Sequence, residues 1–178
     1  GEVATNLSYG VIDNIDIILG IPYQWFKVKE EREDGETISR EKGFSDISLE
    51  LKWRFFEKEG WSFATKPGVT FPTGKEKKDL GSGKFTYSLF FITTKEIKPL
   101  AFHFNLGYTR NENKLDERKD IWHISLASEW EILKDLKLVA NIGLERNPDK
   151  TSNRPPAFIL GGFIYSILEN FDIDFGIK

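Results

Sequence analysis

The arrangement of turns and loops constrains the fold of this chain more than any other feature of its sequence. Short turns lie at residues 12–15, 57–60, 95–98, 133–135 and 168–170, and long, charged loops lie between them at residues 27–44, 73–84, 111–120 and 146–156. Strands that cross a bilayer at a tilt need about 9–11 residues, and the barrels that they form have short turns on one side and longer loops on the other. The alternation therefore predicts an all-β, antiparallel transmembrane β-barrel.

The segments between these turns and loops alternate apolar and polar residues, which is the period of a β-strand with two different faces. In residues 121–131, for example, Trp122 and Leu126 fall on one face while His123 and Ser125 fall on the other. Residues 157–167 are the exception, because both of their faces are largely apolar. Ten strands are predicted in this way, at residues 3–11, 15–26, 45–56, 61–71, 85–94, 99–110, 121–131, 136–145, 157–167 and 171–178.

Composition fits a single domain and removes several classes of function. The chain has 178 residues, and its strand pattern is open at both ends, so we expect residues 1–178 to form one barrel domain that lacks its terminal strands. A formal net charge of −3 with both signs mixed gives no argument for nucleic-acid binding. Without cysteine there is neither a disulfide nor a thiolate metal site, and we expect no cofactor. No apolar run approaches the roughly 20 residues of a membrane-spanning helix.

The tryptophans favour a membrane barrel over a soluble barrel or sandwich, which would show the same alternation. All five fall on the apolar face near strand ends, with aliphatic residues and phenylalanine between them. Two aromatic girdles around an apolar band are typical of the two membrane interfaces, whereas a sandwich core would hold its tryptophans centrally. We therefore expect a location in the bacterial outer membrane, with its lipids as partners. The predicted girdle residues are Trp25, Trp53, Trp61, Tyr108, Trp122 and Trp130.

The polar face of the predicted strands would line the inside of the barrel. Charges buried in a dry interior must be paired, whereas a water-filled interior leaves them hydrated. The mixed signs on this face fit a salt-bridge network that fills the interior, and they equally fit the wall of a wet passage. The predicted lumen-lining residues are Glu50, Lys52, Arg54, Lys66, His103, Asn105, His123, Ser125, Glu129, Glu131, Lys137 and Glu145.

One grouping on the polar face has the residue types of a hydrolase. If Tyr108 lies opposite Trp122, then His103 falls between Ser125 and Glu129 on the neighbouring strand. A lipid hydrolase needs access to lipid, however, whereas these groups face inward, and no nucleophile elbow or oxyanion motif accompanies them. The two histidines of the chain would also lie several residues apart along the sheet, which does not favour a metal site. We therefore expect no enzymatic activity.

Several short motifs resemble one family of outer-membrane proteins. They are Phe71-Pro-Thr-Gly74, Leu80-Gly-Ser-Gly83 leading into Phe85-Thr-Tyr-Ser88, Gly43-Phe-Ser-Asp46, Asn105-Leu-Gly-Tyr108, Tyr9-Gly-Val-Ile-Asp-Asn14 and Leu19-Gly-Ile-Pro-Tyr23. The family is described as "putative MetA-pathway of phenol degradation", and its members are often called transporters. The resemblance covers nearly the whole chain. It implies a barrel of about twelve strands and a link to aromatic compounds, and it supplies no catalytic residues.

The sequence as a whole favours a porin-like channel of a Gram-negative outer membrane. We expect it to let small molecules pass without energy input, with aromatic or hydrophobic compounds as candidate solutes. A structural or partner-binding barrel with a plugged lumen is the alternative, and an outer-membrane lipid hydrolase is the third interpretation. The sequence assigns neither the solute nor the oligomeric state.

Overall fold

The computed structural model describes residues 1–32, 35–168 and 171–177, with side chains described outside residues 28–39, 168 and 171. Most of it is β-structure, and its one helical element is a short 3₁₀ helix. The elements are β1 (Glu2–Ile12), β2 (Ile15–Arg32), β3 (Gly35–Phe44), β4 (Ile47–Lys58), β5 (Trp61–Phe71), η1 (Glu76–Lys78), β6 (Thr86–Ile97), β7 (Leu100–Arg110), β8 (Asp120–Leu133), β9 (Leu136–Glu145), β10 (Ala157–Leu168) and β11 (Phe171–Ile177).

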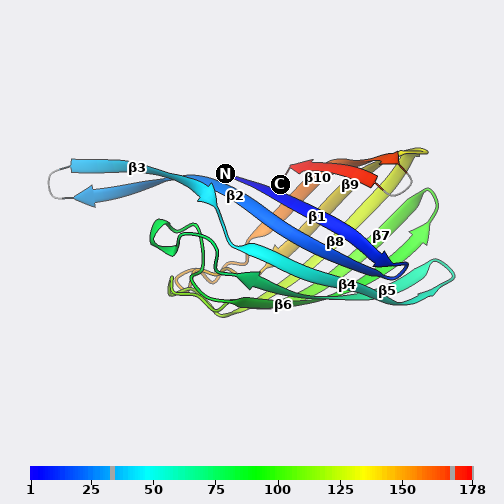
Figure 1. Cartoon of the computed structure of the whole chain (residues 1–178), viewed down its shortest axis with the longest axis horizontal. Helices are drawn as coiled ribbons and strands as arrows, with labels where there is room; N and C mark the ends of the chain where they lie inside the picture. The colour runs from blue at the N-terminus through cyan, green and yellow to red at the C-terminus, as the bar shows by residue number, and fades with distance from the viewer. Residues whose placement is uncertain (33–34, 169–170, 178) are drawn as a thin grey trace.

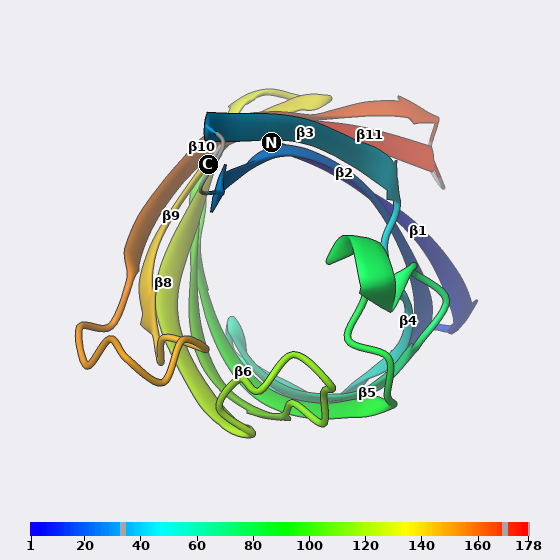
Figure 2. The ribbon, with the colours of Figure 1, turned by 90° about the vertical axis from the view of Figure 1, so that its left-hand side faces the viewer.

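All of the strands belong to one antiparallel sheet that curls around a central axis (Figures 1 and 2). Ten of them follow one another in the order β1-β2-β4-β5-β6-β7-β8-β9-β10-β11, and β3 pairs with β2 beside this path. Within the described residues, β1 pairs only with β2 and β11 only with β10, so both edge strands keep one unpaired edge. The predicted all-β architecture, with ten consecutive antiparallel strands, is confirmed.

Residues 27–44 were predicted as a long loop, but residues 27–32 and 35–44 instead form a two-stranded ribbon, and residues 33–34 lie outside the described residues. The edge of β2 pairs first with β4, from Ile15 to Gly20, and then with β3, from Tyr23 to Arg32. The ribbon projects beyond the sheet at the end where the long loops lie (Figure 1). The prediction was wrong because a run of charged residues does not distinguish a solvated loop from a solvated hairpin, in which the backbone groups of both strands pair with each other.

The opposite end of the sheet consists of short hairpin turns, as predicted. The turn between β4 and β5 shows why such turns suit this fold. Glu59 and Gly60 have φ angles of 52° and 74°, and two consecutive positive φ angles define a hairpin whose twist matches that of the flanking strands. A side chain at Gly60 would also meet the Glu96 carbonyl oxygen, which would lie 2.8 Å from its Cβ.

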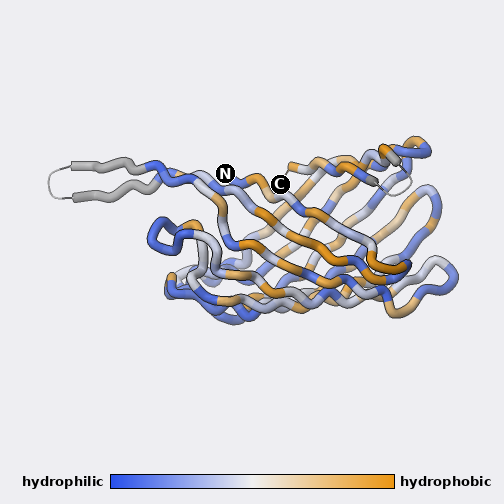
Figure 3. The backbone as a smooth tube through the Cα atoms, viewed as in Figure 1, coloured by the Kyte–Doolittle hydropathy of each residue, from blue (hydrophilic) through white to orange (hydrophobic). Residues whose placement is uncertain are grey.

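The two faces of the curled sheet differ in polarity and in exposure. Large apolar side chains stand on one face and remain exposed, for example Phe104 at 41%, Leu126 at 51% and Ile142 at 59%. The polar residues between them are half-buried on the other face, and the hydropathy of the backbone tube alternates accordingly along the strands (Figure 3). Because a curled sheet crowds its concave side, the half-buried polar side is the inner face.

This sheet has almost no apolar core of its own. Among the described residues, the buried hydrophobic side chains are only Ala64 and Leu80. A soluble sandwich would bury its phenylalanine and leucine residues between two layers, because apolar burial is the main driving force for folding in water. The single curled layer, with its apolar side chains facing away from the axis, excludes the sandwich interpretation.

No helix in the described part of the chain combines the length and the apolar character that a membrane-crossing helix needs.

Candidate functional site

The strand register arranges the inner face in rows that run across the strands, and we number three of them from the loop end. In each row, every residue pairs directly with the next. The first inner row is Lys66, Phe90, Gly107, His123 and Glu145. The second inner row is Ile92, Asn105, Ser125, Gly143 and Phe158. The third inner row is Thr94, His103, Ala127, Asn141 and Leu160.

At one end of the first inner row, two charges neutralise each other. Lys66 Nζ lies 2.8 Å from Glu50 Oε2, and the side chains are 23% and 19% exposed. Lys66 Nζ also lies 5.1 Å from the centroid of the Phe90 ring, which is a favourable distance for a cation over an aromatic face. The pair links β4 to β5 on the inner face. Removing either partner would leave a half-buried charge without compensation.

At the other end of this row, His123 lies between two aromatic rings. Its ring centroid is 5.5 Å from that of Phe90 and 5.6 Å from that of Phe158, and its Nδ1 is 3.7 Å from Glu145 Oε2. The sequence-based list of inner residues omitted both phenylalanines. The signal for Phe90 was its place next to Phe91, since adjacent residues of a strand point to opposite faces. The signal for Phe158 was the apolar character of both faces of residues 157–167.

A second charged group surrounds His103 near the turn end. The register considered in the sequence analysis is the one observed, with Tyr108 opposite Trp122. His103 Nδ1 shares a hydrogen bond of 2.9 Å with Thr94 Oγ1, and its Nε2 lies 3.4 Å from Glu129 Oε1 without hydrogen-bond geometry. Lys137 Nζ lies 3.3 Å from the other oxygen of Glu129. Together these contacts join β6, β7, β8 and β9.

The groups expected of a hydrolase do not form a nucleophile–base pair. The Ser125 hydroxyl accepts a hydrogen bond of 3.1 Å from Asn105 Nδ2, while the ring nitrogens of His103 face Thr94 and Glu129. A serine nucleophile requires its base within hydrogen-bond reach. Beside His103 and Glu129 lies a cavity of about 210 Å³, lined by charges of both signs. This arrangement suits hydrogen bonding and ion pairing on an inner wall.

Three further predicted lumen-lining residues take no part in these contacts, although Glu131 lines the cavity beside His103 and Glu129. Arg54 turns toward the short-turn end, where its Nε lies 3.1 Å from Glu57 Oε2 and its Nη2 donates a bond of 2.8 Å to the Asp13 carbonyl oxygen. Among the described contacts, Lys52 and Glu131 have no ion-pair partner, and Glu131 is exposed. The inner charges are therefore local pairs and do not form one continuous network.

The predicted girdle residues all stand on the face opposite to the inner rows. Their exposed fractions lie between 40% for Trp122 and 51% for Trp130. Trp53, Trp61 and Trp130 are near the short turns, and Lys95 Nζ lies 4.9 Å from the Trp61 ring. The remaining three, Trp25, Tyr108 and Trp122, lie toward the loop end.

The loop between β5 and β6 is folded around the carboxylate of Asp46. Asp46 Oδ1 accepts a bond of 2.9 Å from the Gly74 amide, and its Oδ2 accepts bonds of 2.7 Å from both the amide and the hydroxyl of Ser82. Leu80, which belongs to this loop, is only 2% exposed. Viewed from the loop end, the segment with η1 lies over part of the opening (Figure 2). These contacts involve both glycine-containing motifs of this loop, Phe71-Pro-Thr-Gly74 and Leu80-Gly-Ser-Gly83.

A basic cavity accompanies this loop at the opening. It has a volume of about 520 Å³ and is lined by Lys75, Lys77, Lys78 and Lys114, together with Glu76. Lys114 Nζ lies 2.7 Å from Glu76 Oε2, and Lys78 Nζ lies 2.7 Å from Glu41 Oε2. Among the described contacts, Lys75 and Lys77 have no ion-pair partner.

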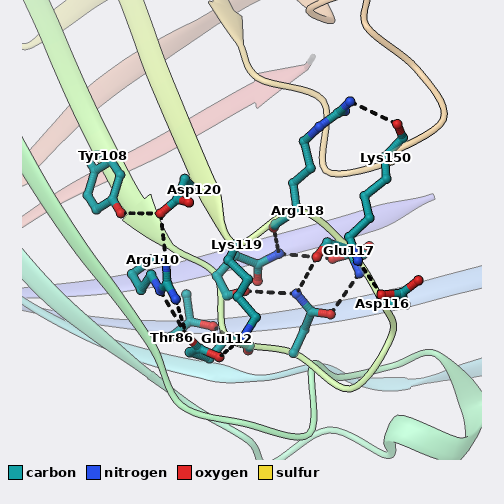
Figure 4. A network of polar contacts seen from close by, with 12 residues as sticks. Thr86, Tyr108, Arg110, Glu112, Asp116, Glu117, Arg118, Lys119, Asp120 and Lys150 are labelled. Carbon is teal, nitrogen blue, oxygen red and sulfur yellow. Dashed lines mark hydrogen bonds and ion pairs between the residues drawn. The ribbon is translucent and has the colours of Figure 1, made fainter.

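Ion pairs also fix the loop between β7 and β8 (Figure 4). Arg110 Nη1 lies 2.8 Å from Asp120 Oδ1, and Arg110 Nη2 lies 2.9 Å from Glu112 Oε1. Lys119 Nζ lies 3.1 Å from the other oxygen of Glu112. The hydrogen bond from Lys119, followed by the one from Arg110, holds the pKa of the Glu112 carboxyl below its usual value. The loop is therefore tied to the ends of the strands that it connects.

A single arginine joins this loop to the next one. The Arg118 guanidinium donates to four backbone carbonyl oxygens and to the side-chain oxygen of Asn153, including bonds of 3.1 Å to Asn147 and 2.6 Å to Ser152. Lys150 pairs with Asp116 beside it. Because a guanidinium carries five N–H donors in a rigid plane, this one side chain can donate hydrogen bonds to several oxygen atoms of the loop between β9 and β10.

The described residues contain no group of three or more side chains that could hold a metal ion. In comparisons with known proteins, the model of one family, described as "Putative MetA-pathway of phenol degradation", matches residues 3–178. No curated protein matches the chain.

Proposed function

We propose, from the premise that this chain belongs to the phenol-degradation family just described, that it is an outer-membrane channel for small molecules. The channel would let solutes pass down their own gradient, and aromatic compounds are the class that the family description favours. No enzymatic step is part of this proposal.

The observation that carries the proposal is the reversed polarity of the curled sheet. Leucine, isoleucine and phenylalanine side chains on the outer face are exposed, from 37% at Leu100 to 73% at Ile159, while polar side chains share the inner face. An apolar surface that surrounds the molecule needs a non-aqueous environment, because monomeric soluble proteins rarely expose large contiguous apolar patches. The exposed tryptophans near both ends support a bilayer, whose interfaces attract tryptophan and tyrosine.

The inner face supports passage more than plugging. The ion pairs Glu50–Lys66 and Glu129–Lys137 each join nearby strands and do not cross the interior. Lys52 and Glu131 have no ion-pair partner among the described contacts, and such charges are stable when water reaches them. A structural barrel with a filled lumen is the second candidate, favoured by the loop that lies over part of the opening (Figure 2).

Single-channel recording of the full-length protein in planar bilayers tests the proposal. We expect steady unitary currents from the wild type. Ala127→Arg, which adds a cation to the third inner row, should lower the conductance and shift ion selectivity toward anions. Leu115→Arg adds the same charge to an exposed loop and serves as the control. Silent bilayers, with insertion verified by protease protection, would contradict the channel and leave the structural barrel.

A further inference from the structure

The basic cavity at the loop end is lined by residues of two different loops. Most of its wall comes from the loop between β5 and β6, which carries η1, and Lys114 comes from the loop between β7 and β8. Its volume of about 520 Å³ is within the range of sites for small molecules. The segment with η1 lies over part of the opening (Figure 2), so a molecule held here would stand beside any path into the interior. We call this site the lysine cavity.

Hydrogen bonds fix both walls of the lysine cavity. The Lys75 carbonyl oxygen accepts a bond of 2.9 Å from the Lys78 amide, which closes the short helical turn. The Lys114 amide donates a bond of 2.8 Å to the Ser82 carbonyl oxygen and so ties the two loops together. The Asp46 carboxylate holds the same β5–β6 loop from below, as described above. Walls that are already held in place need little ordering when a ligand binds, which lowers the cost of binding.

The four lysines of the cavity differ in how their charges are compensated. Lys78 and Lys114 each have a glutamate oxygen 2.7 Å from Nζ. Lys75 and Lys77 are exposed and have no ion-pair partner among the described contacts. Two positive charges therefore remain uncompensated in one cavity, although the chain as a whole carries a formal net charge of −3. The excess of positive charge is a local property of this site and not of the whole surface.

A phosphate group matches this arrangement better than a carboxylate does. A phosphate monoester carries about −1.5 to −2 charges at pH 7 and three strong acceptor oxygens on one compact group. A carboxylate carries one charge, and its planar shape is best matched by the two parallel N–H groups of arginine. The cations of this cavity are lysines, whose ammonium groups act as compact point charges and commonly bind phosphate. Both the charge and the type of donor thus favour phosphate.

We propose that the lysine cavity binds a phosphate-bearing anion, with Lys75 and Lys77 supplying the uncompensated charge. A free phosphorylated solute and the phosphate of a lipid headgroup share this chemistry. As a feature of a channel entrance the inference rests on the proposed function, because positive charge beside an opening raises the local concentration of anions. Binding itself is measurable without any current.

Isothermal titration calorimetry of the full-length protein in a neutral detergent, with pyrophosphate as the probe, tests the site. Ionic strength is held constant so that screening does not change during the titration. Wild type should bind the probe saturably, and Lys75→Gln combined with Lys77→Gln should weaken binding at least about tenfold. The matched control is Lys98→Gln with Lys134→Gln, which removes two exposed lysines without ion-pair partners among the described contacts at the short-turn end. It makes the same change in net charge and should leave affinity within about twofold.

A second substitution should change the affinity in the opposite direction. Glu76→Gln removes the carboxylate that compensates Lys114 inside the cavity, so it should tighten binding about fivefold. Glu57→Gln, which removes a carboxylate paired with Arg54 at the short-turn end, is the control and should leave affinity within about twofold. A wild type without saturable binding, equal weakening in the two lysine double variants, or weaker binding in Glu76→Gln would overturn the site.

A lipid competition distinguishes the two sources of phosphate. The protein is placed in phosphatidylcholine nanodiscs with or without diphosphorylated lipid A, and pyrophosphate is titrated again. Affinity that falls at least about tenfold with lipid A supports the site with a lipid phosphate as its ligand, whereas unchanged affinity supports it with a free solute. A protein that is silent in bilayers yet shows lysine-dependent binding would lose the channel and keep the site. A conducting protein without lysine-dependent binding would lose the site and keep the channel.

Discussion

At the scale of single residues, neighbouring positions of one strand meet opposite surroundings. In β8, Ser125 is 4% exposed on the inner face, whereas Leu126 is 51% exposed on the outer face. This is the reverse of a soluble protein, in which the leucine would be covered and the serine would reach water. The effect of an added charge on stability should therefore depend on which face of the strand the residue occupies.

A pair of arginine substitutions at neighbouring positions tests this difference between the two faces. Leu126→Arg places a cation against lipid and should lower the free energy of unfolding by roughly 2–4 kcal/mol if the residue lies near the midplane. Ala127→Arg places the same cation on the inner face, where Glu129 on the same side of the strand can pair with it, and should cost about 1 kcal/mol or less. Urea unfolding in lipid vesicles measures both values. Equal losses would contradict a lipid-exposed outer face.

At the scale of elements, the loops are held by charged side chains more than by apolar packing. Glu112 joins Arg110 and Lys119, and Arg118 bonds to the backbone between β9 and β10. No sequence motif predicts these contacts. Each joins residues from different parts of the loops through arginine, lysine or glutamate side chains, which are common on any protein surface. The long loops were predictable as solvated segments, but their mutual connections were not.

Acid should loosen the loop between β7 and β8. The pKa of Glu112 is lowered in the folded state by Lys119 and Arg110, so its contribution is present above the unfolded pKa of about 4.3 and is lost as the pH falls through the folded value. The chain has no cysteine, so a spin label on Leu115→Cys reports on this loop alone. Label mobility should rise below about pH 4. In Glu112→Gln the label should already be more mobile at pH 7, with a shallower pH profile; identical profiles would refute the role of Glu112.

The strands show what a sequence pattern can and cannot predict. Alternation and the turns located ten strands, and the register considered for two of them, with Tyr108 opposite Trp122, is the observed one. The predicted inner residues were chosen by polarity, so the list omitted Phe90 and Phe158, which lie on the inner face. Residues 27–44 were likewise treated as a loop, because pairing between two solvated strands leaves no apolar signal. Strand period and turn length are local properties, whereas ring packing over Gly107 and Gly143 depends on the assembled register.

At the scale of the whole molecule, the sheet has two different ends. The long loops and the β2–β3 ribbon gather at one end, and the short hairpin turns gather at the other (Figure 1). A barrel inserted in a membrane with one orientation would therefore show the two sets of connections to opposite compartments. In outer-membrane barrels the longer connections are extracellular and the short turns are periplasmic.

Single cysteines placed at both ends test this sidedness on intact cells, since the native chain has none. Lys77→Cys and Thr151→Cys lie on long loops and should react with a membrane-impermeant maleimide added outside. Asp135→Cys lies on a short turn, is also exposed in the structure, and should react only after the outer membrane is permeabilised. Because Thr151 and Asp135 are both exposed, a difference in labelling reports on the compartment and not on burial. Equal labelling of Thr151→Cys and Asp135→Cys in intact cells would mean that the sheet does not span the membrane in this orientation, and the channel would lose its geometric basis.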